Sequence, residues 1–366
     1  MKEYYKKDTC RLCDSKNLKL VLKLHKSPLC DAYIKDKKSQ EFYDLNLYYC
    51  MDCNFVQIDT IIDPQIIYKE YIYVTSSSQG LIEHFNQYCD DVSKNISLDS
   101  NSLVIDIGSN EGSLLKAFKD KNYKVLGIEP STKAAGIANA NGIKTICDFF
   151  NKEKAVEIIA DYGHASLITV NNLFANIDDL FEFTDAIETV LDKNGVLVIE
   201  SSYLLDMINN MVFDFIYHEH LSYFSILPLI NFFNKFSMHL IHVEEVSTKG
   251  GSMRYYWSKK DSNISEDESV KKLIAKEQKF NINLNTFKVF NSNIEKQKSK
   301  LLEFLEKNID KEIVGFGASA TSTTLITHFG LNKYIKYLVD ENEDKIGTYS
   351  PGYNIPVYGL NKLKED

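Results

Sequence analysis

The chain has 366 residues, of which 44% are hydrophobic and 25% charged, and this composition excludes a disordered or fibrous protein and a single small module. With 42 Lys and Arg against 51 Asp and Glu, the net charge of −9 disfavours nucleic acid as the main partner. No stretch approaches the ~18 apolar residues of a membrane helix, and no apolar run follows residues 1–7, so we expect a cytoplasmic protein without a membrane partner.

Residues 1–68 form the first predicted domain, and their cysteines predict a metal site. In the absence of a secretion signal, the 7 cysteines of the chain indicate reduced thiols rather than a disulfide framework. Two C-x-x-C pairs are separated by 36 residues, and strand-like runs at 18–24 and 42–49 can bring them together. Each pair puts two thiolates on one tight turn, and two pairs complete a tetrahedral site without an open position. The sequence therefore predicts a structural Zn²⁺ bound by Cys10, Cys13, Cys50 and Cys53.

Two other interpretations of these cysteines remain. A redox role is disfavoured because redox C-x-x-C motifs occur singly at the start of a helix. A chance pairing of buried thiols is the second alternative. The remaining cysteines have no partner at this spacing, and we interpret Cys30, Cys89 and Cys147 as core cysteines.

A strand, a glycine-containing turn and a helix are predicted at the start of the second domain. An apolar run at 103–108 contains Asp106 and ends at Gly108. A second buried strand, at 124–129, ends in Glu129, 21 residues beyond Gly108. An acidic residue at the carboxyl end of the second strand is where nucleoside-binding α/β folds hold a ribose diol.

The first turn indicates which nucleoside binds. It lacks the G-x-G-x-x-G spacing that cradles a dinucleotide pyrophosphate. Asp106 would repel a phosphate, but it can accept from, or lie near, the ammonium group of an amino-acid moiety. With Glu129, this predicts S-adenosylmethionine as the cofactor; a plain strand-to-helix connection is the alternative. The residues predicted to bind the cofactor are Asp106, Gly108, Ser109, Asn110, Gly112, Glu129, Pro130, Asp148, Phe149 and Asn171.

Three further strands alternate with helices, and two more form a hairpin with Lys-Gly-Gly at its turn. These five runs are 144–148, 166–172, 195–201, 239–246 and 252–259. Near-continuous apolar runs are typical of parallel strands covered by helices on both faces. The order predicts an α/β fold in which residues 69–260 form the Rossmann-like sheet of class I methyltransferases.

A polar loop at 213–225 follows the carboxyl end of the fifth strand, where doubly wound sheets bind their ligands. It gathers two histidines, a glutamate and two tyrosines, all of which can move protons. We therefore expect it to carry the chemistry. A catalytic metal is disfavoured because no further ligands are found, and a purely structural role for the histidines is the alternative.

These motifs, with Gly-Gly-Ser-Met-Arg at 250–254, together resemble the S-adenosylmethionine-dependent nucleotide-sugar C-methyltransferases that act on 4-keto deoxysugars and carry an N-terminal zinc-binding domain. The likeness spans nearly the whole chain. It implies that the zinc domain and a Rossmann-like C-terminal domain help to hold a nucleotide sugar. It also implies that His220 is the base, assisted by Tyr217 and Glu219, and that Tyr71 lies in the active site.

The implied reaction begins at the hydrogen next to the 4-keto group, which the ketone acidifies. His220 would remove it, a tyrosine would stabilise the enolate, and the carbanion would attack the sulfonium methyl group.

Two positions depart from the pattern of these C-methyltransferases. Asn176 stands where they have a second active-site histidine, and an amide can hydrogen-bond but cannot act as a base. Thr321 stands where their C-terminal domain has a lysine. An O-methyltransferase for a sugar or small molecule therefore remains open, as does a non-catalytic zinc- and nucleotide-binding module. The acidity disfavours an RNA methyltransferase, and both a monomer and a dimer remain open.

Residues 261–366 are predicted to form a helical linker and the C-terminal domain. The stretch 266–308 is free of Pro and Gly and rich in Lys, Glu and Leu, which predicts long helices. A strand and glycine turn at 313–317 and a strand at 337–340 predict a small Rossmann-like unit, without the third glycine that nicotinamide cofactors need. The 54 residues from 313 onward are compatible with a short or a truncated domain.

Overall fold

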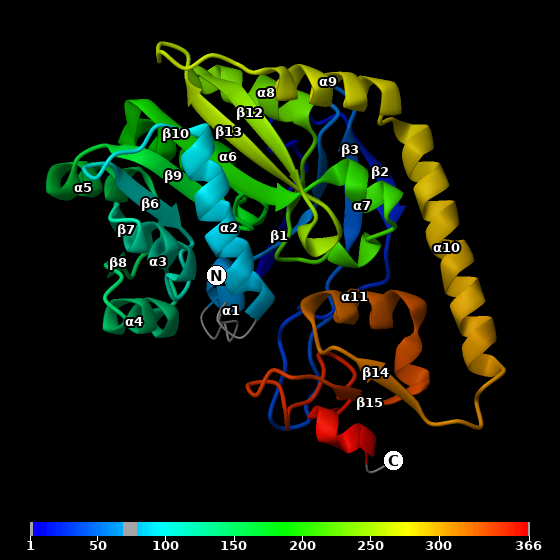
Figure 1. Cartoon of the computed structure of the whole chain (residues 1–366). Coiled ribbons are helices and arrows are strands. Elements are labelled where there is room, and N and C mark those ends of the chain that lie inside the picture. Colours follow the sequence, from blue (N-terminus) through cyan, green and yellow to red (C-terminus); the bar gives the residue numbers. More distant parts are fainter. Residues whose placement is uncertain (1–2, 69–78, 365–366) are drawn as a thin grey trace.

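The computed structural model describes residues 3–68 and 79–364. Its largest element is a seven-stranded sheet in the order β12-β13-β10-β9-β6-β7-β8 (Figure 1). The strands from β10 to β8 are parallel, whereas β13 pairs antiparallel with β10 and β12. The bounds are β6 (Leu103–Ile107), β7 (Lys124–Ile128), β8 (Thr145–Ile146), β9 (Ala165–Asn171), β10 (Leu191–Ser202), β12 (Met238–Val246) and β13 (Ser252–Lys259). The predicted class I methyltransferase sheet is thus confirmed.

Side chains alternate along these strands and divide the core between two layers of helices. In β6, Val104 packs with residues of the first layer, and the next residue, Ile105, packs with those of the second. The first layer is α2 (Gln79–Asn95), α3 (Ser113–Asp120) and α4 (Thr132–Ala140). The second is α5 (Lys152–Tyr162), α6 (Leu180–Val190), α8 (Ile226–Phe233) and α9 (Glu268–Phe280). Cover on both faces is what buried parallel strands require.

A four-stranded sheet in the order β11-β4-β3-β2 lies beside the large sheet. Its strands are β2 (Leu18–Lys23), β3 (Asn46–Cys50), β4 (Val56–Ile58) and β11 (Ser222–Tyr223). Three of them come from the predicted zinc domain, but β11 belongs to the polar loop expected to carry the chemistry. The neighbouring elements are β1 (Tyr4–Lys6), β5 (Thr60–Ile62), α1 (Pro64–Tyr68) and α7 (Leu204–Asn209).

The C-terminal third contains two helices followed by a small parallel sheet, as the sequence predicts. After α9, the long α10 (Leu284–Glu306) runs along one edge of the molecule toward this sheet (Figure 1). The remaining elements are β14 (Ile313–Phe316), α11 (Ala320–Phe329), β15 (Ile335–Val339) and β16 (Val357–Tyr358). The zinc domain touches this unit, because Lys345 Nζ lies 2.7 Å from Asp31 Oδ1.

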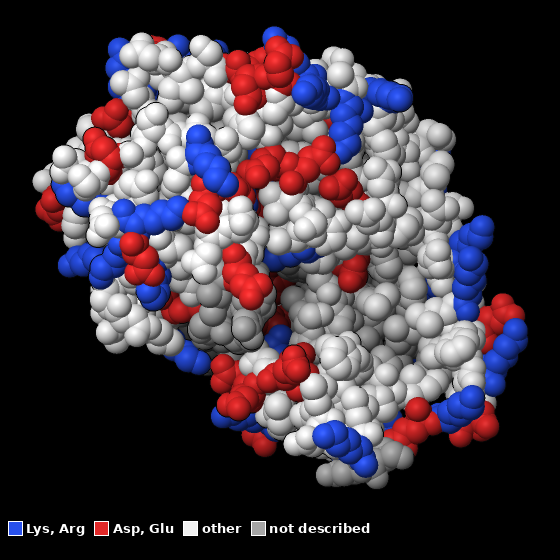
Figure 2. Space-filling view, in the orientation of Figure 1, with Lys and Arg blue, Asp and Glu red and all other residues white. Residues whose placement is uncertain are grey.

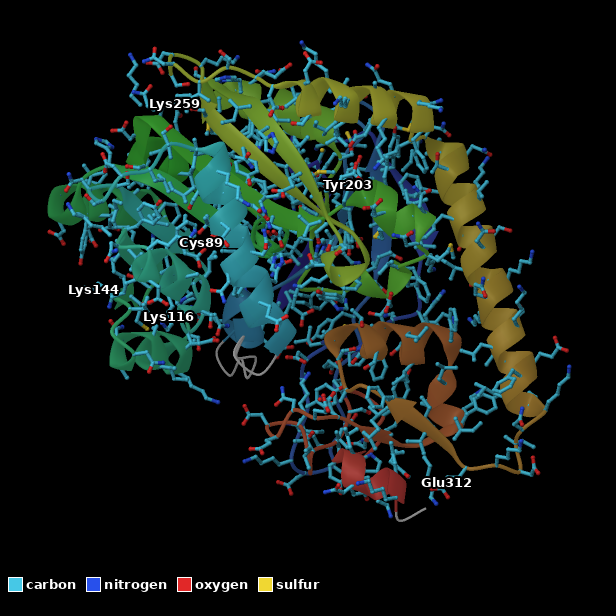
Figure 3. All side chains as sticks on the ribbon, in the orientation of Figure 1. Cys89, Lys116, Lys144, Tyr203, Lys259 and Glu312 are labelled. Carbon is cyan, nitrogen blue, oxygen red and sulfur yellow. The ribbon has the colours of Figure 1, made fainter. Side chains whose placement is uncertain are left out.

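A buried carboxyl group docks α9 against the methyltransferase sheet. Glu277 accepts hydrogen bonds from the Tyr203 hydroxyl at 2.9 Å and from the Ile226 N–H at 2.7 Å. Tyr203, labelled in Figure 3, lies at the start of α7 in the interior. Burial raises the pKa of Glu277 to about 7.

Short 3-10 helices complete the fold: η2 (Phe174–Asn176), η3 (Phe213–Phe215), η4 (Asn234–Phe236), η5 (Thr248–Gly250), η6 (Leu331–Lys333) and η7 (Leu360–Lys364). None of the helices in the described residues has the length and apolarity to cross a membrane. The described residues on the face shown in Figure 2 intersperse Lys and Arg with Asp and Glu, and this face is hollowed near its centre.

One prediction about the core is wrong. Cys30 and Cys89 are buried as expected, but Cys147 is exposed. It follows the last residue of β8, the edge strand of the sheet, where no neighbouring strand covers it.

Candidate functional site

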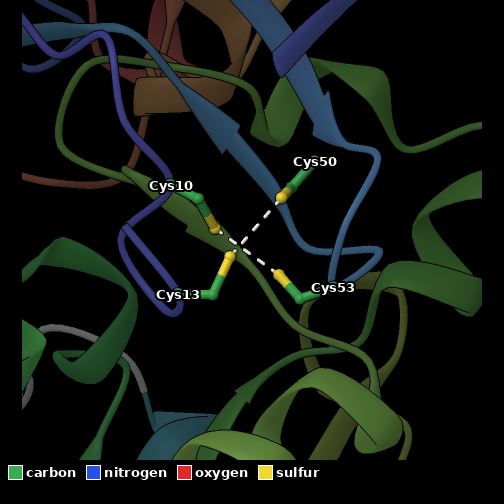
Figure 4. A group of neighbouring side chains, drawn as sticks. All are labelled: Cys10, Cys13, Cys50 and Cys53. Atoms are coloured by element: carbon green, nitrogen blue, oxygen red, sulfur yellow. Dashed lines mark hydrogen bonds between the residues drawn. The ribbon is translucent and has the colours of Figure 1, made fainter. Parts of the chain in front are cut away.

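The four predicted zinc ligands form one cluster (Figure 4). All four Sγ atoms lie within 4.8 Å of one another, with 3.5 Å between those of Cys10 and Cys53 and 3.6 Å between those of Cys13 and Cys50. A tetrahedral zinc ion with Zn–S bonds of ~2.3 Å requires sulfur atoms about 3.8 Å apart. The cluster therefore fits a structural Zn²⁺ with four thiolate ligands.

The two cysteine pairs lie on matching turns. In each, the residue four positions after the first cysteine donates its N–H to that cysteine's carbonyl at 2.9 Å: Asp14 to Cys10 and Asn54 to Cys50. Asp14 and Asn54 both have positive φ, 60° and 65°, which aspartate and asparagine tolerate better than most residues. The same local chemistry therefore builds both halves of the site.

The glycine-containing turn after β6 joins a strand to a helix, as the sequence predicts, and it is closely packed. Gly108 and Gly112 have φ of 78° and 82°, and a Cβ at Gly112 would lie 2.8 Å from Ile143. The turn is tied to the second strand, because the N–H groups of Gly108 and Ser109 donate to the carbonyl of Ile128. These hydrogen bonds hold the turn beside the carboxyl end of β7, where the ribose is expected.

Two carboxyl groups line this edge. Glu129 accepts the Asn110 N–H at 3.0 Å and the Ser131 N–H at 2.8 Å, which fixes the carboxylate at the end of β7. Burial nevertheless raises its pKa. Asp106 accepts a hydrogen bond from the Thr169 hydroxyl at 2.6 Å, and burial raises its pKa to about 7.

Asn171 supplies the clearest sign of a binding site. It ends β9 beside the turn, and both polar atoms of its amide are buried without a hydrogen-bond partner among residues 3–68 and 79–364. Buried amides are normally satisfied, so this pair fits polar groups of a bound molecule. Asp148 and Phe149 are exposed after β8 and Pro130 is half-buried after β7, so all three lie at the same edge of the sheet. These donors and acceptors fit S-adenosylmethionine.

His220 lies in the polar loop with its ring packed against two tyrosines. Its ring centroid is 4.7 Å from that of Tyr223 and 6.0 Å from that of Tyr217. The Nδ1 atom is buried and has no hydrogen-bond partner among the described residues. Burial, together with the positive charge of Lys249, lowers the pKa of His220 to about 3. The imidazole is therefore neutral at pH 7.

The neighbours of His220 face the zinc domain. His218 Nε2 lies 3.1 Å from the Asp44 carbonyl, a backbone contact that fits a structural histidine, and burial lowers its pKa to about 4. Burial raises the pKa of Glu219 to about 7, and its carboxyl faces the backbone of residues 30 and 31. Its Oε2 atom is buried and has no hydrogen-bond partner in the part of the chain that the structure describes.

The structure describes two of the remaining predicted catalytic residues, Tyr217 and Asn176. Tyr217 packs edge-on against His220, and Asn176 ends η2 in the loop after β9. That loop meets the polar loop directly, because the Leu221 N–H donates to the Ala175 carbonyl at 2.8 Å. Tyr71 lies outside the described residues.

Three family models match successive parts of the chain. They describe a zinc binding domain at residues 10–68, a methyltransferase domain at 81–243 and a C-methyltransferase C-terminal domain at 247–366. The chain is an S-adenosylmethionine-dependent methyltransferase.

The methyltransferase is 27% identical over 358 residues to the C-methyltransferase NovU of Streptomyces niveus, covering 96% of this chain and 85% of NovU. Two solved structures are similar to parts of it. One is the magnesium protoporphyrin IX methyltransferase ChlM of Synechocystis PCC 6803 with bound SAH, at 14% identity, 49% and 84% coverage and a TM-score of 0.38. The other is a SAM-dependent methyltransferase of Anabaena variabilis ATCC 29413, at 16% identity, 54% and 90% coverage and a TM-score of 0.39.

Lys249 is a residue of the methyltransferase that the sequence analysis missed as part of the site. It lies in the turn between β12 and β13 with a left-handed φ of 54°. The surrounding protein lowers its pKa, although the charge of Glu200 opposes this effect. Lys249 is exposed, and its positive charge lowers the pKa of His220. The sequence shows the hairpin but not that its turn packs against the segment after β10, where the Asn210 amide donates to the Gly250 carbonyl at 2.8 Å.

A buried ionic network adjoins Asn171. Glu200 pairs with Asn171 in the sheet register, and its carboxylate lies 2.8 Å from His84 Nε2 and 2.9 Å from Arg254 Nη2. Burial opposes ionisation of Glu200, but these two partners hold its pKa below the usual value. The Arg254 guanidinium also lies 4.1 Å over the ring of Tyr88. Glu200 was also missed by the sequence analysis. The criterion that singled out Glu129, an acidic residue near the carboxyl end of a strand, applies to Glu200 as well.

Proposed function

We propose that the methyltransferase methylates a carbon of a nucleotide-linked keto sugar, and that His220 is the base. The observation that carries the proposal is the buried, neutral imidazole of His220, whose Nδ1 atom has no partner among the described residues. The match to a C-methyltransferase C-terminal domain and the likeness to NovU, itself named a C-methyltransferase, support transfer to carbon.

Proton removal is the step that a neutral imidazole can perform. A ketone acidifies the hydrogen on the adjacent carbon, and His220 takes this proton on a ring nitrogen while the electron pair moves to the ketone oxygen. The ammonium of Lys249, or a tyrosine hydroxyl such as that of Tyr217, then stabilises the enolate. Glu129 and Asn171 would hold S-adenosylmethionine, which would supply an electrophilic methyl group. The enolate carbon would bond to this methyl group as its bond to sulfur breaks, which would leave S-adenosylhomocysteine. Glu219 and Asn176 are assigned to orienting the base and the sugar.

The test uses the dTDP, UDP and GDP derivatives of 4-keto-6-deoxyglucose as probes. Each is incubated in D₂O with the protein, with and without S-adenosylmethionine. Mass spectrometry measures deuterium uptake and methyl gain, and NMR of the product locates the methyl group. We expect one probe to exchange its hydrogen next to the ketone without the methyl donor and to gain a methyl group on that carbon with it.

The assigned base is tested with His220→Asn. We expect this variant to bind S-adenosylhomocysteine with unchanged affinity in calorimetric titration and to lose both exchange and methylation, by at least 100-fold. His164→Asn, at an exposed position, is the matched control and keeps full turnover. Full turnover of His220→Asn would overturn the assignment of the base, and a methyl group on oxygen would overturn C-methylation.

A further inference from the structure

A buried arginine connects the zinc site to the polar loop. Arg11 lies between the zinc ligands Cys10 and Cys13, and its side chain is 0% exposed. Its Nε donates to Asp178 Oδ1 at 3.0 Å. Its Nη1 donates to the Ile58 carbonyl at 2.8 Å and, more weakly, to the Leu221 carbonyl at 3.4 Å. A single guanidinium thus leaves the zinc turn and reaches three other segments.

Two of these contacts are adjacent to proposed catalytic residues. Leu221 directly follows His220, and Asp178 lies two residues after Asn176. The backbone of Leu221 is held on both sides, since its N–H donates to Ala175 and its carbonyl also accepts the Ile58 N–H at 3.0 Å. Arg11 therefore meets both loops that carry the proposed chemistry.

The ring of His220 depends on these backbone contacts for its position. Its Nδ1 atom has no hydrogen-bond partner in the described part of the chain. The ring packs at 4.7 Å against Tyr223, which lies in β11 and pairs with Val56 of the zinc-domain sheet. The orientation of the imidazole is thus set by elements that the zinc domain holds.

We infer that Arg11 is a positioning residue for His220, through which the zinc turn fixes the place of the base. This inference rests on the proposed function, because it takes His220 as the base. Displacement of a catalytic group by about 1 Å can cost ~100-fold in rate. A buried arginine is suited to this role because its planar fork donates in several fixed directions at once.

The decisive variant is Arg11→Lys. Lysine keeps the charge opposite Asp178, which also pairs with Lys7 at 3.2 Å, so the half-buried carboxylate keeps a positive partner. A single ammonium cannot reproduce the three donations of the guanidinium. The matched control is Lys235→Gln, because Lys235 Nζ donates to the Leu12 carbonyl of the same zinc turn at 2.8 Å and, within the described part of the chain, forms no hydrogen bond to either loop.

Hydrogen exchange gives a measurement that needs no substrate. We expect Arg11→Lys to lose amide protection in segments 172–178 and 213–223, including the Leu221 N–H, while zinc content and affinity for S-adenosylhomocysteine stay within twofold of wild type. Lys235→Gln should leave the protection of both segments unchanged. Unaltered protection in Arg11→Lys would overturn the inference.

Kinetics separate positioning from a merely structural effect. With the probe that the protein turns over, we expect Arg11→Lys to lower kcat at least tenfold with little change in KM, and to slow solvent exchange in parallel. His220→Asn/Arg11→Lys should be no slower than His220→Asn, since Arg11 acts through that residue. A normal kcat in Arg11→Lys beside an inactive His220→Asn would overturn the inference alone, whereas an active His220→Asn would overturn the proposed base.

Discussion

The ionisation of His220 is set by its burial and by a charged neighbour. Its pKa of about 3 is far below the ordinary 6.5, first because the ring is desolvated and second because of the Lys249 ammonium. A base acts only when deprotonated, so activity falls as the pH drops through its pKa. The low pKa keeps His220 competent over the whole neutral range.

Replacing Lys249 with methionine should raise the pKa of His220, because the repelling charge is gone while burial remains. We expect the acid limb of kcat/KM to move to higher pH in Lys249→Met and to stay below 6.5. Lys249→Arg keeps the charge and should leave the limb in place. Lys116→Met, at an exposed position of α3, serves as a distant control. An acid limb at the same pH in Lys249→Met and wild type would show that Lys249 does not act on the base.

At the scale of elements, the turn after β6 and helix α4 respond in opposite ways to the same substitution. Gly112→Ala forces a Cβ to within 2.8 Å of Ile143 at a φ of 82°, so we expect a loss of about 1–3 kcal/mol in stability and weaker binding of S-adenosylhomocysteine. Gly136→Ala lies within α4 with no atom near its Cβ, so we expect a gain of about 0.5–1 kcal/mol and unchanged binding. Thermal unfolding and calorimetric titration measure both. A Gly112→Ala protein that is as stable as wild type would contradict the close packing of the turn.

The large sheet could be predicted because buried parallel strands leave apolar runs in the sequence. The run 252–259 coincides with β13 (Ser252–Lys259). β10 begins at Leu191, four residues before its predicted start. Residues 192–194 are polar and interrupt the apolar run, and the pairing with β9 shifts register between Leu191 and Val196.

The parts of the site that the sequence did not predict depend on contacts between distant segments. β11 is two residues long and pairs with β4, which lies in another domain of the sequence, so no periodicity marks it. Arg11 stands between two zinc ligands, and its sequence context indicates only the metal. The turn that carries Lys249 packs against the segment after β10, where the Asn210 amide donates to the Gly250 carbonyl, and no local pattern marks this contact. By contrast, the four cysteines could be predicted from their spacing, and Glu129 from its position at the end of a predicted strand.

At the scale of the whole molecule, the N-terminal segment contacts both other parts of the chain. Its sheet includes β11 from the polar loop, and its Asp31 binds Lys345 of the C-terminal unit. Cys10 and Cys50 belong to the same buried cluster as residues of the large sheet. The zinc site therefore supports the polar loop proposed to carry the chemistry as well as its own domain.

Loss of zinc should separate cofactor binding from turnover. Structural zinc contributes about 10–16 kcal/mol to the folding of small zinc domains, so Cys50→Ser removes the main support of the N-terminal sheet. We expect Cys50→Ser to contain no zinc, to unfold at a lower temperature and to lose turnover. It should still bind S-adenosylhomocysteine, because Glu129 and Asn171 lie on the seven-stranded sheet. Metal analysis, thermal unfolding and calorimetric titration provide the readouts.

The control for this change is Cys147→Ser, an identical substitution at the exposed cysteine. It should keep its zinc, its unfolding temperature and its turnover, which shows that the effects at Cys50 do not come from the loss of any thiol. Retention of one zinc per chain in Cys50→Ser would contradict the four-cysteine site. Loss of S-adenosylhomocysteine binding together with zinc would contradict the independence of the cofactor site, and would mean that the buried cluster shared by Cys50 and the large sheet folds as one unit.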